Sequence, residues 1–285
     1  MLKRLSLPVL LAVVALLMGA DIANAAKPEP WQMGFQEAAS PTMAMLVDFH
    51  DLLLWIITAI TVFVLILLII LVVRFNEKAN PTPSKTTHNT LLEIAWTAIP
   101  VLILVVIAVP SFRLLYFADR THDAEMTLKI IGHQWYWSYE YPDQGNFTFD
   151  SNMVAEEDLQ EGDLRLLTVD NKVVLPVNTD IRLLMTSDDV IHNWAMPAFG
   201  TKLDTVPGRT NETWVRIEKE GLYHGQCSEL CGVNHGFMPI QVKAVSKEAF
   251  AAWVVKAKKE FASTDVTPTP INLASAAKTA AGSNK

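Results

Sequence analysis

Two long apolar stretches without charged side chains constrain this chain more than any other feature of its sequence. They comprise 22 residues at 52–73 and 19 residues at 94–112 of a 285-residue chain. At the rise of an α-helix they span roughly 33 and 28 Å, close to the bilayer hydrocarbon thickness of about 30 Å. We therefore predict a hairpin of two transmembrane helices in contact with membrane lipid, over about residues 50–74 and 91–117. Pro100 and Pro110 should kink the second helix. Such kinks are tolerated where a neighbouring helix satisfies the freed backbone groups, which favours a partner membrane subunit.

The flanking residues predict the orientation of this hairpin. An apolar run over residues 5–18 follows two basic residues and precedes Ala23–Ala25, as in a secretory signal peptide over residues 1–25 that is cleaved after Ala25. An uncleaved anchor is the alternative. The loop over residues 74–89 has three basic residues against one acidic residue, which places it in the cytoplasm. We expect residues 26–118 to form an N-terminal segment and the hairpin, with both termini in the periplasm of a bacterial inner membrane.

Residues 119–261 differ from the hairpin in composition and predict a separate outer domain. Residues 119–260 hold 22 acidic and 14 basic side chains, a net charge of −8 against −7 for the whole chain. Such an acidic domain excludes a nucleic-acid partner held by phosphate contacts and favours a basic or neutral partner.

Short β-branched or alternating runs in the outer domain predict an all-β sandwich or barrel. The runs cover residues 126–131, 164–169, 181–186 and 212–217. Over residues 246–261 the spacing between apolar residues lengthens from the two positions of a strand to the three or four of a helix, which predicts one short helix. Residues 262–285 are rich in Ala, Ser, Thr, Pro and Lys without periodicity, so we expect a disordered tail.

A cluster of soft metal-binding residues follows the last of these strand-like runs. Cys227, Cys231, His235 and Met238 lie within 12 residues, bounded by Pro239. Thiolate, thioether and imidazole together select copper over magnesium or calcium, and a methionine argues against structural zinc. The sequence therefore predicts a copper site.

The number of copper ions depends on the role of Cys227. Cys231, His235 and Met238, with His192 from another strand, fit a mononuclear blue-copper site and leave Cys227 unused. If both sulfurs instead bridge two ions, the backbone carbonyl of Glu229 is placed to be a further weak ligand. A Cys227–Cys231 disulfide in an oxidising compartment and a membrane-tethered copper chaperone are further alternatives.

Four motifs carry a resemblance to a known family, which extends from about Phe49 to Phe261. They cover residues 132–140 (GHQWYWSYE), 189–194 (DVIHNW), 204–209 (DTVPGR) and 227–238 (CSELCGVNHGFM). With them the chain resembles subunit II of the haem–copper cytochrome c oxidases of the aa3 type. The resemblance implies a two-helix transmembrane hairpin followed by an all-β cupredoxin-like Greek-key barrel or sandwich with a dinuclear copper A centre. The implied ligands are His192, Cys227, the Glu229 carbonyl, Cys231, His235 and Met238.

The resemblance also implies roles for residues around the copper. The Glu229 side chain would bind magnesium at the interface with the catalytic subunit. Trp135 would receive the electron from cytochrome c, although packing alone is the simpler interpretation of any one ring in this aromatic run. Glu140, Asp143 and Asp189 would attract the basic cytochrome, against a general solubilising role for surface acids. Glu93 would lie at the mouth of a proton channel, or simply in the headgroup zone.

The implied function is that of the electron-accepting subunit of a proton-pumping terminal oxidase. The chain would take electrons from cytochrome c at copper A and pass them to haem in catalytic subunit I, where O2 is reduced to water. A quinol oxidase subunit II shares the fold but lacks the copper ligands, and all six ligand positions are filled here. A purely structural subunit would carry a disulfide in their place.

Overall fold

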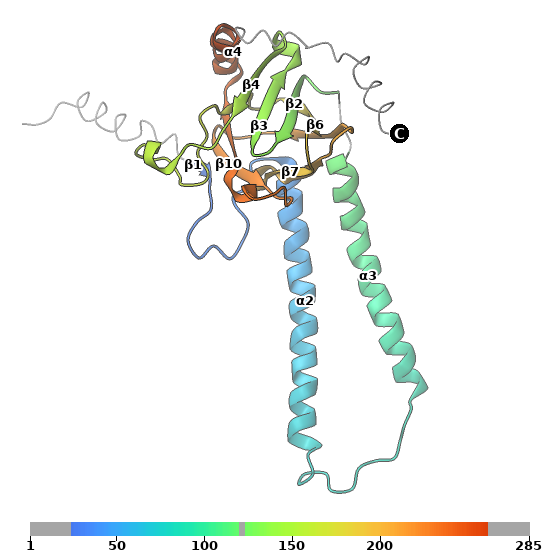
Figure 1. Ribbon diagram of the computed structural model, residues 1–285. Helices are drawn as coiled ribbons and strands as arrows, with labels where there is room; N and C mark the ends of the chain where they lie inside the picture. The colour runs from blue at the N-terminus through green and yellow to red at the C-terminus, as the bar shows by residue number, and fades with distance from the viewer. Residues whose placement is uncertain (1–23, 120–122, 262–285) are drawn as a thin grey trace, which may run out of the picture.

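Two long helices extend from one end of a β-sandwich domain in the computed structural model, which describes residues 24–119 and 123–261 (Figure 1). The predicted fold class, a two-helix hairpin plus an all-β cupredoxin-like domain, is confirmed. The predicted signal peptide, apart from the short strand β1 at Asn24–Ala26, and the predicted tail lie outside the described residues. The proposed cleavage point after Ala25 falls within β1.

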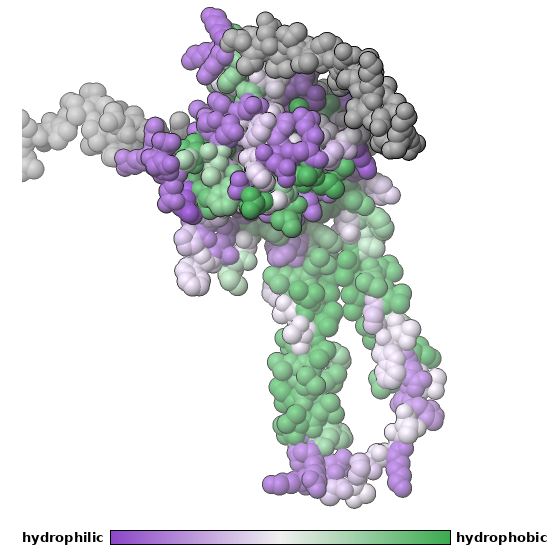
Figure 2. Space-filling model, in the orientation of Figure 1, coloured by the Kyte–Doolittle hydropathy of each residue, from purple (hydrophilic) through white to green (hydrophobic). Residues whose placement is uncertain are grey.

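The helices are α2 (Pro41–Arg74) and α3 (Thr90–Asp119), each longer than the predicted span. An apolar band covers both between the hydrophilic outer domain and the polar loop that joins them (Figure 2). The most apolar window of each helix has no buried residue, so its side chains are largely accessible in the described chain. The helices diverge away from the outer domain (Figure 1).

Helix α2 begins inside the outer domain, nine residues earlier than predicted. The Ser40 hydroxyl accepts a hydrogen bond from Met43 N (3.0 Å) and donates one to Phe199 O (2.7 Å). Pro41 occupies the first helical turn, where its missing N–H costs nothing. The first turn of α2 is therefore packed on the domain before the chain reaches the membrane.

Helix α3 runs without interruption through Pro100 and Pro110. Its last turn is held by strand β9: Trp214 Nε1 donates to Phe117 O (3.0 Å) and Thr213 Oγ1 to Ala118 O (3.3 Å). Each helix thus has its own attachment to the sandwich.

The two sheets of the sandwich share a buried aromatic core. One has the order β4-β3-β2-β6-β9 and the other β5-β11-β10-β7-β8, with β1 paired to β10. The strands of the first are β2 (Met126–His133), β3 (Tyr136–Tyr141), β4 (Phe147–Ser151), β6 (Asp180–Ser187) and β9 (Asn211–Arg216). Those of the second are β5 (Val173–Pro176), β7 (His192–Met196), β8 (Thr201–Thr205), β10 (Gly221–Cys227) and β11 (Pro239–Val245). Helix α4 (Lys247–Phe261) and the single 3-10 turns η1 (Pro142–Gln144), η2 (Glu156–Asp158), η3 (Pro197–Phe199) and η4 (His235–Phe237) complete the described elements.

Three of the four predicted strand runs lie in β2, β6 and β9, and residues 246–261 form α4 as predicted. The strand predicted over residues 164–169 is wrong. Thr168 accepts a hydrogen bond from Leu164 N at its hydroxyl (3.0 Å), while its own N–H bonds Leu164 O (3.1 Å). These local bonds hold the segment in turns, with Leu166 at a positive φ of 64°, and compete with strand pairing.

Candidate metal centre

The soft side chains of residues 227–238 meet because β10 ends at Cys227 and the chain loops back to begin β11 at Pro239. β7 pairs with β10 so that Cys227 lies opposite Trp194, which brings His192, at the start of β7, to the same end of the sheet. Cys227, Cys231, Met238 and His192 are buried, and His235 is half-buried.

The donor atoms lie close enough to surround one small volume. Cys231 Sγ is 3.8 Å from Cys227 Sγ, 3.5 Å from His235 Nδ1 and 3.6 Å from Met238 Sδ. The Glu229 carbonyl oxygen is 3.3 Å from Cys227 Sγ, and the Glu229 side chain is exposed at the surface. Both thiols are free, and their separation far exceeds the roughly 2.05 Å of a disulfide bond. The disulfide alternative is therefore not the state of this structure.

His192 tests whether this set of donors fits a metal ion. Its Nε2 lies 2.8 Å from Asp189 Oδ1, whereas its Nδ1 is buried without a hydrogen-bond partner. One ring nitrogen and the sulfurs of Cys227 and Cys231 lie within 4.8 Å of one another. Buried polar atoms rarely stay unpaired, and a soft cation between imidazole and thiolates satisfies all three. The residues therefore fit copper.

The two cysteines have opposite acidities. Burial disfavours the Cys227 thiolate, but the neighbouring His192 imidazole and the backbone amide of Asn193 outweigh burial and lower the pKa of Cys227. For Cys231, burial and the neighbouring Cys227 thiolate both raise the pKa. Cys227 is thus the more acidic of the two thiols, and a metal that binds both displaces their protons.

Asp189, predicted as a docking carboxylate, lies directly behind His192. Burial opposes its ionisation, but hydrogen bonds from His192 and the amides of Val190 and Gln134 lower its pKa. The two amide bonds are both 2.6 Å long. A carboxylate in this position fixes the tautomer and orientation of a metal-binding imidazole.

Trp135 contacts the cysteine loop directly. Its Nε1 donates to Cys231 O at 3.1 Å, and Gln134 Nε2 donates to the same oxygen at 2.7 Å. Gly232 makes room for both side chains, because a Cβ on it would lie 3.0 Å from the Trp135 ring and 3.1 Å from Gln134 Nε2. Trp135 is half-buried, so one part of its ring faces solvent while another touches a cysteine backbone.

The sequence did not identify three residues that support the donors. Trp137, interpreted as packing, donates from Nε1 to Met238 O (3.2 Å) and stands edge-on to the His192 ring. A Cβ on Gly132 would lie 2.7 Å from His192 Cδ2, so only glycine leaves space for that ring. Gln134 is the third, and nothing in its local sequence marks it.

Exposed apolar side chains surround the cysteine loop. They are Ile191, Leu230, Val233 and Phe237, with exposed fractions of 44%, 78%, 83% and 46%. Apolar side chains grouped at one end of an acidic domain are typical of a contact surface for another protein.

The other two predicted docking acids lie on β3 and in η1. Glu140 Oε2 accepts a hydrogen bond from Lys129 Nζ at 2.7 Å, and Asp143 Oδ2 accepts one from Thr127 N at 2.6 Å. Both carboxylates therefore have partners within the domain, as Asp189 does.

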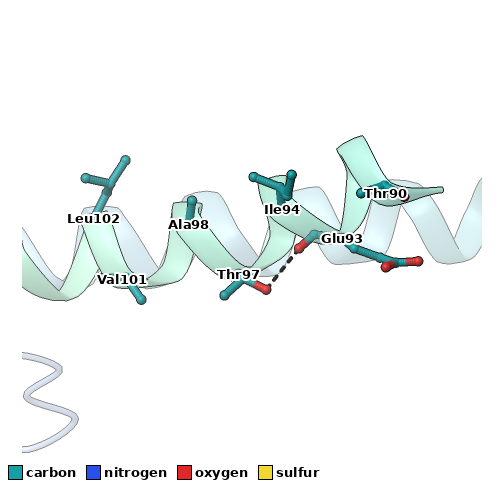
Figure 3. A pocket seen from close by; sticks show the side chains of 7 residues that line it. All are labelled: Thr90, Glu93, Ile94, Thr97, Ala98, Val101 and Leu102. Atoms are coloured by element: carbon teal, nitrogen blue, oxygen red, sulfur yellow. Dashed lines mark hydrogen bonds between the residues drawn. The ribbon is translucent and has the colours of Figure 1, made fainter.

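Glu93 lies far from this centre, in the first turn of α3. Its carboxylate accepts a bond from Asn89 N (3.3 Å), and Asn89 Oδ1 accepts one from Leu92 N (3.1 Å), a reciprocal cap. Glu93 and Thr97, whose hydroxyl donates to Glu93 O, line a groove along one side of the helix (Figure 3).

A β-sandwich that gathers two thiols, two imidazoles and a thioether at one end, and that is carried on an apolar two-helix hairpin, defines a membrane-anchored cupredoxin-type metalloprotein. Models of cytochrome c oxidase subunit II match the chain twice: the periplasmic domain at residues 126–245 and the transmembrane domain at residues 28–114. The chain belongs to the cytochrome c oxidase subunit II family. It is therefore the electron-accepting subunit of a haem–copper oxidase, a membrane protein with a periplasmic domain.

Individual relatives match this chain over most of their own length. A probable cytochrome c oxidase subunit 2 of Rickettsia bellii is 52% identical over 87% of this chain and 93% of its own length. Cytochrome c oxidase subunit 2 of Zea mays is 50% identical over 79% of this chain and 89% of its own. The crystallised periplasmic domain of subunit II from Bradyrhizobium japonicum is 54% identical, covers 50% of this chain and 99% of that domain, and has a TM-score of 0.47.

Proposed function

We propose that the outer domain accepts electrons from a cytochrome c at a dinuclear copper A centre held by six residues. The ligands are His192, Cys227, the backbone carbonyl of Glu229, Cys231, His235 and Met238. The unpartnered Nδ1 of buried His192, beside two free thiols, is the observation that carries this proposal. When bound, a pair of copper ions held by these residues would supply one-electron redox chemistry.

The residues around the donors keep them in place. Asp189 holds His192 with Nδ1 toward the sulfurs, because its carboxylate accepts the hydrogen bond from Nε2–H. Trp137 restrains the Met238 backbone, and Gln134 and Trp135 restrain that of Cys231. Hydrogen bonds that fix ligand positions in advance reduce the reorganisation that accompanies each change of charge.

Trp135 is the proposed point at which the electron enters the domain. Its ring is half-exposed among the apolar residues Ile191, Leu230, Val233 and Phe237, and its Nε1 touches Cys231 O. A cytochrome c that docks on this apolar surface would bring its haem edge close to the ring. Glu140, Asp143 and Asp189 add negative charge, which raises the association rate of a basic partner more than its affinity.

Two further roles extend the proposal to the oxidase complex. The exposed Glu229 side chain would bind magnesium against catalytic subunit I, while its carbonyl faces the thiols. Glu93 would stand at the cytoplasmic mouth of a proton channel, since it lies in a groove at the loop end of α3. We also propose a bacterial inner membrane, cleavage after Ala25 and both termini in the periplasm.

Copper loading of the purified full chain in detergent tests the central proposal. We expect two copper ions per chain, a near-infrared band and an EPR hyperfine pattern from one electron shared by two nuclei. Cys227→Ser should lose the near-infrared band, whereas the matched control His88→Asn, in the polar loop, should keep it. One copper with a blue spectrum would show that Cys227 is not a ligand. Absence of copper binding would exclude the centre.

A further inference from the structure

The segment over residues 27–39, between β1 and α2, displays apolar side chains that the described chain does not cover. We call it the 27–39 loop. Trp31 is 94% exposed and Met33 is 100% exposed, the highest values among the large apolar side chains of the described residues. Phe35, two positions further, is 47% exposed. Exposure of large apolar side chains to water is unfavourable, so this group of side chains indicates a partner of apolar character.

Several polar groups at the N-terminal end of the 27–39 loop bond within the loop. Gln32 N donates to Glu29 O (3.2 Å), and the Gln32 side chain accepts from Glu29 N (3.2 Å) and donates to Phe35 O (2.7 Å). Lys27 Nζ lies 3.7 Å from Glu29 Oε1, so two opposite charges are paired. A loop that pairs part of its own backbone and charges and directs its apolar side chains outward suits surroundings poor in water.

The position of the loop along α2 indicates what those surroundings are. The Phe35 ring stands edge-on to the His50 ring, with centroids 4.8 Å apart. A groove between loop and helix is lined by residues 34–38 and by α2 residues as far as Asp51. The uncharged stretch of α2 starts at Leu52, one residue or about 1.5 Å further along the helix. The loop projects from the outer domain beside the first part of α2 (Figure 1).

We propose that the 27–39 loop inserts Trp31 and Met33 into the headgroup–acyl boundary of the outer leaflet and so acts as a third membrane contact of the outer domain. Trp is enriched at this depth because its ring is apolar and its N–H is polar. The uncharged stretch of α2 begins one residue beyond the part of the helix that the loop faces, which favours lipid over a protein partner. The inference rests on the proposed placement of the hairpin in the membrane.

Site-specific photo-cross-linking in the assembled oxidase, in its native membrane, tests this proposal. Trp31 is replaced by p-benzoylphenylalanine, and the adducts formed on irradiation are identified by mass spectrometry. We expect phospholipid adducts at least about five times more abundant than at Val255, an exposed residue of α4 at the end of the domain away from the helices. Adducts mainly to another oxidase subunit, or no excess over position 255, would overturn the proposal.

A control position separates this proposal from the placement of the hairpin. Leu65, in the middle of α2, is 53% exposed and should form adducts with lipid or with a membrane subunit. Adducts at position 65 without lipid adducts at position 31 would contradict only the loop proposal. Absence at both would contradict the membrane placement.

A second measurement applies if the photoreactive variant does not assemble. Brominated phospholipids quench tryptophans at the interface, and the chain has eight. The quenchable fraction should fall in Trp31→Phe and stay unchanged in Trp253→Phe, because the Trp253 ring on α4 packs against Phe147 and Phe149 of β4 in the outer domain. An equal fraction in wild type and Trp31→Phe would exclude insertion.

Discussion

The cysteine end of the outer domain and the transmembrane hairpin differ in how their side chains are held. At the cysteine end they have partners within the domain, whereas along the hairpin most are exposed. Around the donors, His192 is held by Asp189, Cys231 by Gln134 and Trp135, and Met238 by Trp137. Along the hairpin, Leu65 is 53% exposed and Leu104 is 64% exposed. The domain therefore fixes its own site, whereas the apolar side chains of the hairpin stay accessible to surrounding molecules. Substitutions at the two ends should have correspondingly different consequences.

Cys231→Ser should have the largest effect. Cys231 lies within 4 Å of three other donors, and serine replaces a soft thiolate with a hard hydroxyl. We expect the rate of cytochrome c oxidation by the assembled oxidase to fall by more than about 100-fold, since loss of an outer orienting group alone costs about 10–100-fold. Stopped-flow spectroscopy measures the rate. A variant with near-normal turnover would remove Cys231 from the site.

Asp189→Asn comes next, because it removes the charge behind His192 and keeps the shape. Copper binding to the full chain should weaken by about 10–100-fold. A competition titration against a copper chelator measures this change. If Asp189 serves only in docking, affinity for copper should stay constant while the salt dependence of cytochrome c association changes.

Gly132→Ala sharpens the comparison at a position without a functional group. The added methyl would lie 2.7 Å from His192 Cδ2 and 2.9 Å from Thr205 Oγ1. Overpacking of this kind costs about 1–3 kcal/mol, so the thermal unfolding temperature should fall and copper binding should weaken. Gly236→Ala is the matched control, because nothing lies within 4 Å of its Cβ position. Equal effects of the two substitutions would contradict the close approach.

Ser40→Ala tests the joint between the two regions. It removes the N-cap bond to Met43 N and the bond to Phe199 O, and we expect a loss of about 1 kcal/mol. Thermal unfolding followed by circular dichroism should show a fall of a few degrees with the copper spectrum unchanged. A changed copper spectrum would mean that this joint also shapes the metal centre.

Leu65→Ala should have the smallest effect on the purified chain. Its side chain has no buried contact within the hairpin, so the unfolding temperature of the outer domain should not change. Co-purification of the catalytic subunit should decrease if this face of α2 packs against it. A shift in outer-domain stability would show that the hairpin and domain are coupled beyond the joint at Ser40.

The features that the sequence predicted well are local in the chain. The loop of residues 227–238 carries four soft side chains close together, and the uncharged spans need no tertiary information. Gly132 and Gln134 were missed because they act only where β2 and the cysteine loop meet in space. The early start of α2 has a local signal, Ser40 before Pro41, but this signal lies outside the uncharged span from which the helix was predicted. The error at residues 164–169 has the opposite cause, since a local hydroxyl overrode the strand pattern.

The two helices enter the sandwich on different sheets. Ser40 binds the turn between β7 and β8, whereas Phe117 and Ala118 bind β9 of the other sheet. A body tethered at one point swivels and tilts, but a body held at two separated points keeps only the freedom to rock about the line between them. The rate of electron tunnelling falls exponentially with distance. By restricting the motion of the domain, the double attachment therefore fixes the distance and orientation of the metal-binding residues relative to the membrane.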